Sequence, residues 1–67
     1  MQYHVICEYD LMQLIDDDGN GHDAMPLGPG QDVIAAGKRK IDEWKREYPT
    51  IDAAAAKREL TNYVSGY

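Results

Sequence analysis

The sequence lacks the features of a secreted or membrane-spanning protein. Cys7 is the only cysteine, so no disulfide can form within the chain. No stretch approaches the roughly 18 consecutive apolar residues of a membrane-spanning helix. The first residues carry neither a basic cluster nor a long apolar run, so we expect no signal peptide. These absences predict a cytoplasmic protein with no membrane partner.

The chain is also short of basic residues for its number of acids. Its 67 residues allow one small domain (1–67), and the net charge is −5. A chain this acidic is a poor candidate for a general binder of nucleic acid or anionic membranes. A domain of this size with no disulfide often depends on a partner or on self-association for part of its stability.

The first half of the sequence predicts a strand, a short helix and a loop. Residues 3–9 alternate between apolar and polar side chains, which favours a strand. Asp10 fits a helix N-cap, and the apolar spacing that follows predicts a short helix over 11–17. A single helix over 3–15 is the competing interpretation. Residues 16–30 hold four of the six glycines and two of the three prolines, so we expect a loop, with 25–27 as an extended piece paired with the first strand.

The second half predicts two helices. Apolar and small residues recur every three or four positions over 31–48, and Pro49 ends that segment. Thr50 fits the N-cap of a last helix over 51–64. The short connection predicts an antiparallel helical hairpin in which Trp44 faces Ala53–Ala56 and Gly37 faces the turn with Leu60 and Tyr63. The predicted fold class is therefore α+β: a strand, helix and loop part (1–30) followed by a helical hairpin (31–67).

The opening of the chain resembles a family of short, uncharacterised bacterial and phage domains. The residues that carry the resemblance lie within 3–28: Tyr3-x-Val5-Ile6, then Asp10-Leu11-x-x-Leu14-Ile15, then Pro26-Leu27-Gly28. Such domains begin with a strand, a capped helix and a Pro-x-Gly turn, which is what the resemblance implies here. It implies no function.

Charge is divided unevenly along the chain, and this division points to a binding role. Residues 1–32 contain seven acids and no lysine or arginine, whereas residues 33–67 contain five acids and seven bases. An acidic surface steers association with a basic partner and can occupy a groove built for phosphates. In size and charge the chain is similar to phage-encoded inhibitors of nucleic-acid machinery, including anti-CRISPR proteins. The similarity implies a nucleic-acid mimic that occupies a basic nucleic-acid-binding protein. The predicted contact residues are Glu8, Tyr9, Asp10, Asp16, Asp17, Asp18 and Asp23.

One segment partly matches a calcium-binding loop. Residues 16–21 read Asp-Asp-Asp-Gly-Asn-Gly, the first half of an EF-hand loop, and the oxygen ligands would be Asp16, Asp18 and Asn20. The second half departs from the pattern, because Leu27 occupies the position of the bidentate glutamate. A calcium-responsive loop with weak Ca²⁺ binding is therefore an alternative function, and no other cofactor is expected.

The remaining alternatives are an enzyme, a DNA-binding regulator and a homodimer. Cys7 has only His4 and His22 as candidate bases, and the chain carries no metalloprotease motif or phosphate-binding glycine loop, so we expect no enzyme and no catalytic residue. The last two helices have the spacing of a small helical DNA-binding regulator, although the second opens with alanines and an acid. An exposed edge of the first strand also favours pairing with a second copy.

Overall fold

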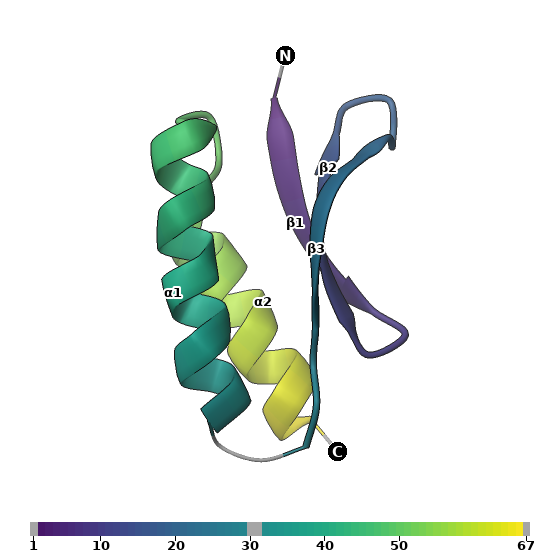
Figure 1. The fold of residues 1–67 in the computed structure, drawn as a ribbon, viewed down its shortest axis with the longest axis vertical. Coiled ribbons are helices and arrows are strands. Elements are labelled where there is room, and N and C mark those ends of the chain that lie inside the picture. Colours follow the sequence, from purple (N-terminus) through teal and green to yellow (C-terminus); the bar gives the residue numbers. More distant parts are fainter. Residues whose placement is uncertain (1, 30–31, 67) are drawn as a thin grey trace.

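The computed structural model describes residues 2–29 and 32–66. The elements are β1 (Tyr3–Glu8), β2 (Leu11–Asp16), β3 (Gly21–Pro26), α1 (Asp32–Glu47) and α2 (Ala53–Ser65). The strands form an antiparallel sheet in the order β1-β2-β3. Both helices cover the same face of this sheet and run in opposite directions, as Figure 1 shows. Within the described residues, neither helix is long and apolar enough to cross a membrane.

The predicted α+β class is confirmed, but the predicted helix over 11–17 is wrong. That segment is β2, the central strand, and its side chains alternate between buried and half-buried. Met12, Leu14 and Asp16 face the helices, and the intervening residues face the open side of the sheet. The apolar spacing fits a helix and a strand equally well, and pairing with strands on both sides decides for the strand.

The predicted loop over 16–30 is also wrong in part. Residues 21–26 form β3, which pairs with β2 and not with the first strand as expected for 25–27. A register irregularity between Leu14 and Ile15 leaves His22 as the extra residue of β3. Gly19 has a φ of 83°, so the turn between β2 and β3 uses the one residue type that adopts this conformation without strain.

The turn between β1 and β2 contains only Tyr9 and Asp10. Their φ angles are 52° and 60°, the left-handed conformation that two-residue hairpin turns require at both positions. Glycine, which lacks a Cβ atom, and asparagine or aspartate, whose short side chains can hydrogen-bond locally, usually occupy such positions, so Tyr9 is the unusual residue here. Asp10 is therefore a turn residue and not the expected N-cap of a helix.

The core lies between the sheet and the helices. Its most completely buried side chains come from β2, α1, the α1–α2 connection and α2: Met12, Leu14, Ile41, Trp44, Ile51 and Leu60. A β-carbon added at Gly37 would lie 2.5 Å from Leu60 Cδ2, which confirms the predicted contact between Gly37 and the turn with Leu60. Because Gly37 has no side chain, α1 and α2 approach closely at this point.

The N-terminal cap of α2 differs from the sequence prediction by two residues. Asp52, and not Thr50, is the N-cap, and its carboxylate accepts a hydrogen bond from the Ala55 backbone N–H at 3.1 Å. Thr50 Oγ1 instead accepts a hydrogen bond from the Tyr3 backbone N–H at 3.3 Å. Thr50 thus ties the start of β1 to the connection between the helices.

Candidate interaction surfaces

The sheet divides the predicted contact residues between its two ends. Glu8, Tyr9 and Asp10 lie at the β1–β2 turn, whereas Asp16, Asp17 and Asp18 lie at the opposite end of β2. Six strand residues at about 3.3 Å each separate the two groups by roughly 17–20 Å. Asp23 lies between them on β3. The carboxylates therefore do not form one continuous patch.

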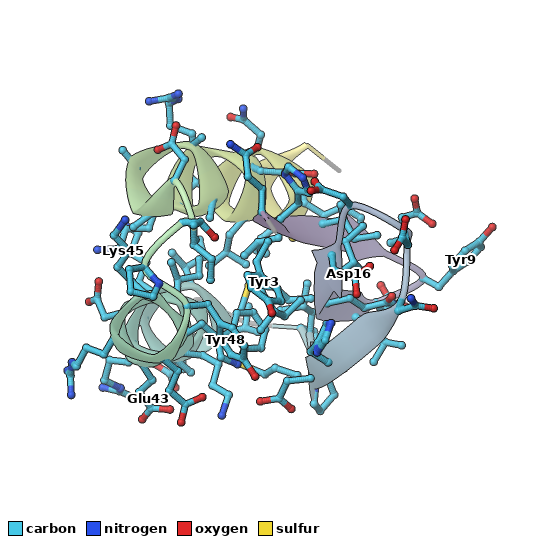
Figure 2. The ribbon with its side chains drawn as sticks, turned by 90° about the horizontal axis from the view of Figure 1, so that it is seen from above. Tyr3, Tyr9, Asp16, Glu43, Lys45 and Tyr48 are labelled. Atoms are coloured by element: carbon cyan, nitrogen blue, oxygen red, sulfur yellow. The ribbon has the colours of Figure 1, made fainter. Side chains whose placement is uncertain are left out.

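Asp16 is a buried structural residue. Its side chain is 5% exposed, and its Oδ1 accepts hydrogen bonds from the backbone N–H groups of Asp18 (2.9 Å) and Asn20 (3.0 Å). Its Oδ2 lies 2.9 Å from His22 Nε2. The His22 hydrogen bond is the main cause that lowers the pKa of Asp16, helped by the two N–H groups and opposed by burial. These contacts shape the β2–β3 turn, which Figure 2 shows beside the labelled Asp16.

His22 joins this turn to an aromatic cluster that sequence reasoning missed. The His22 ring meets the Tyr3 ring edge-on, with centroids 5.1 Å apart, and lies 6.1 Å from the Tyr48 ring. The Tyr3 and Tyr48 rings are 4.5 Å apart, and the two labelled side chains lie next to each other in Figure 2. The register irregularity that places His22 here depends on strand pairing and leaves no local signal in the sequence.

The arrangement gives the predicted calcium site no support. Both carboxylate oxygens of Asp16 already have partners inside the turn, and the Asn20 N–H donates to one of them. Among the described residues, no group of three or more His, Cys, Asp or Glu side chains is placed to hold a metal ion. The segment 16–21, whose sequence matches the start of an EF-hand loop, is thus held in its turn conformation by its own hydrogen bonds.

Asp17 and Asp23 also have partners within the molecule. Asp17 accepts a hydrogen bond from the Gln2 backbone N–H at 3.1 Å and lies 3.0 Å from His4 Nε2, and these contacts lower its pKa in that order. Asp23 accepts a hydrogen bond from Trp44 Nε1 at 2.9 Å, which is the main cause of its lowered pKa, and lies 3.6 Å from Lys40 Nζ. Asp23 therefore fastens β3 to α1.

The tip of the β1–β2 hairpin presents one aromatic side chain to solvent. Tyr9 is 87% exposed and projects away from the rest of the molecule in Figure 2. Asp10 beside it is held in place: its N–H donates to the Tyr63 hydroxyl at 3.0 Å, and its C=O accepts from the Leu27 N–H at 2.8 Å. The tip is thus tied to α2 and to the end of β3, although it is a turn.

The cysteine and the basic residues were the other candidates for chemistry. Burial, and to a lesser degree Glu59, raises the pKa of the Cys7 thiol to about 11, so it stays protonated at neutral pH. His4 lies on the opposite face of β1. The basic side chains Lys38, Lys57 and Arg58 line an open groove of about 260 Å³ between the helices, where Lys57 Nζ lies 2.8 Å from Asp42 Oδ1. No single helix presents them as a recognition surface.

Comparisons with protein families, curated proteins and solved structures found no match to this chain.

Proposed function

We propose that this protein is a non-enzymatic binding module whose β1–β2 hairpin tip contacts a basic partner protein. The observation that carries the proposal is the conformation of Tyr9. A tyrosine in the left-handed region is strained, yet here it is 87% exposed and makes no contribution to the core. The hairpin turn requires this conformation but does not require a tyrosine, and backbone strain of this kind is typical of binding sites. Tyrosine is also enriched at protein interfaces, since it presents a large surface at little cost in conformational entropy.

The charge around the tip defines the kind of partner. Glu8 and Asp10 flank Tyr9, and neither lysine nor arginine occurs in residues 1–32. Such a field attracts a positively charged surface and speeds its association. Mimicry of nucleic acid and an anti-CRISPR role stay predictions. The acidic residues are spread over two ends of the sheet and do not form the continuous acidic surface that such a mimic needs. The structure gives more support to a local contact through the aromatic tip and its two acidic neighbours.

Capture of the partner from the organism that encodes the protein tests this proposal. The wild-type protein and the variants Tyr9→Asn, Glu8→Lys and Glu47→Lys are immobilised, and the bound proteins are identified by mass spectrometry. Glu47 is exposed at the end of α1 remote from the tip, so Glu47→Lys is the matched charge control. We expect one basic protein that wild type and Glu47→Lys retain and that Tyr9→Asn and Glu8→Lys lose. If the wild-type protein and all three variants retained that protein equally, the hairpin tip would not be the binding site.

A further inference from the structure

We propose that the groove between the free edge of β1 and α2 binds an extended, basic segment of another protein, which pairs with β1 as an added strand. This surface is distinct from the hairpin tip. It involves the backbone of β1 and side chains from the first half of α2.

The register of the β1–β2 hairpin shows which backbone groups are free. Glu8 and Leu11 close a two-residue turn, so they form a hydrogen-bonded pair. Because such pairs alternate in antiparallel strands, the N–H and C=O groups of Tyr3, Val5 and Cys7 point away from β2. The Tyr3 N–H already finds a partner outside the sheet, Thr50 Oγ1 at 3.3 Å.

The next two N–H groups along this edge have no partner in the part of the chain that the structure describes. Within residues 2–29 and 32–66, no acceptor outside the sheet is found for the N–H of Val5 or of Cys7. Both residues are nearly buried, at 7% and 8% exposure. An unpaired backbone group that is mostly removed from water is costly, and a strand laid along this edge satisfies it.

A groove leads to this edge. It has a volume of about 410 Å³ and lies between residues 3–6 of β1 on one side and, on the other, residues 51 and 52 of the α1–α2 connection with residues 55, 56 and 59 of α2. Its apolar lining includes Val5, Ile6, Ile51, Ala55 and Ala56. α2 packs against β1, and Figure 1 shows the two elements side by side. The short alanine side chains keep the helix surface low beside the strand, which leaves room for the side chains of an added strand.

The charge of the groove identifies its occupant as basic. Asp52 and Glu59 line it together with His4, whose Nε2 lies 3.0 Å from Asp17 Oδ1, and no lysine or arginine does. Glu59 has no hydrogen bond or ion pair within the described part of the chain, and its charge reaches the β1 edge, where it contributes to the raised pKa of Cys7. A second copy of the chain fits poorly, because none of its three strands contains lysine or arginine. The complementary strand must therefore come from a different protein.

Amide NMR with a short synthetic strand tests the inference. The probe is an end-blocked Lys-Val-Lys-Val-Lys-Val peptide, because main-chain pairing requires only an extended backbone and basic side chains give charge complementarity. A peptide of the same sequence in which every backbone nitrogen is N-methylated has the same charge but has no N–H to donate along either edge, so it cannot pair as a strand. We expect the first peptide to shift the amide signals of Val5 and Cys7 and to slow their hydrogen exchange. We expect the N-methylated peptide to do neither.

Charge variants of the protein complete the test. Glu59→Lys should weaken binding of the first peptide about tenfold, whereas Glu47→Lys should change it less than about twofold. Tyr9→Asn should leave it unchanged, so the groove and the hairpin tip can fail independently. Equal binding of both peptides, or absence of exchange protection at Val5 and Cys7, would overturn the inference. The inference would also be overturned if sedimentation showed a dimer and hydrogen exchange showed Val5 and Cys7 protected without any peptide. A second copy of the chain would then occupy the edge.

Discussion

The contact between Gly37 and Leu60 allows a quantitative test of how α1 and α2 pack. In Gly37→Ala, the new methyl group would lie 2.5 Å from Leu60 Cδ2 and 3.2 Å from Cδ1. Leu60 is completely buried, so its side chain cannot move aside into solvent. The substitution therefore changes the free energy of unfolding in two opposite ways: alanine favours the helix, and its methyl group disturbs the packing against Leu60.

The two effects have known sizes. Replacing glycine by alanine inside a helix stabilises it by about 1 kcal/mol. Forcing an additional methyl group into a packed core costs about 1–3 kcal/mol. Because the gap is too small for the methyl group, we expect the packing cost to exceed the helix gain, with a net loss of about 1 kcal/mol. For a domain of this size, such a loss lowers the melting temperature by about 4–8 °C.

Urea unfolding followed by circular dichroism measures the free energy of unfolding of the variant and its controls. Ala35→Gly, at an exposed position of α1, gives the helix term alone and should cost about 1 kcal/mol. Leu60→Val removes the Cδ atoms that oppose the new methyl group. In that background Gly37→Ala should become stabilising. If Gly37→Ala stabilises the wild-type protein by the full helix term, the close approach of the helices at Gly37 is incorrect.

Four further predictions concern the sheet and its ends. Tyr9→Asn should raise the free energy of unfolding by about 0.5–1 kcal/mol in urea unfolding, because asparagine tolerates the left-handed turn better; a loss of stability would contradict the strain at the tip. Trp44→Phe should cost about 2–3 kcal/mol in the same assay, because it removes the hydrogen bond to Asp23 and leaves part of the buried indole volume empty; Trp44→Phe with Asp23→Ala should cost less than the sum of the single variants. The lowered pKa of Asp16 means that its contribution to stability is complete above the ordinary pKa of 3.8 and is lost as the pH falls through the lower folded value. Asp16→Ala should therefore destabilise the protein at pH 7 and flatten the loss of stability below pH 4, as followed by thermal melts; an unchanged acid limb would contradict this. The Cys7 thiol, with a pKa raised to about 11, should react with a thiol reagent at pH 7.5 only after urea unfolds the protein, and rapid reaction in the folded state would contradict its burial.

The proposed binding surfaces differ in how far sequence could predict them. Tyr9 and its acidic neighbours are consecutive in sequence, and an interface role for this tyrosine follows from residue type alone. The strained backbone at Tyr9 could not be predicted from residue type, because its positive φ arises in a turn that forms only when β1 and β2 pair. The groove at the β1 edge has no local signal, since it brings residues 3–6 next to residues 51–59.

The sequence by itself determined the α+β class, the two helices and the contact between Gly37 and Leu60. These features depend on periodicity, on Pro49 as a helix stop and on a short connection, all of which act over a few residues. Only the tertiary structure decided that 11–16 is the central strand and that Asp16 is buried against His22. Strand pairing joins residues far apart in sequence, and a short apolar segment takes whichever secondary structure lets it bury one face. The same pairing separated the acidic residues, because a strand carries its two ends to opposite sides of a small domain.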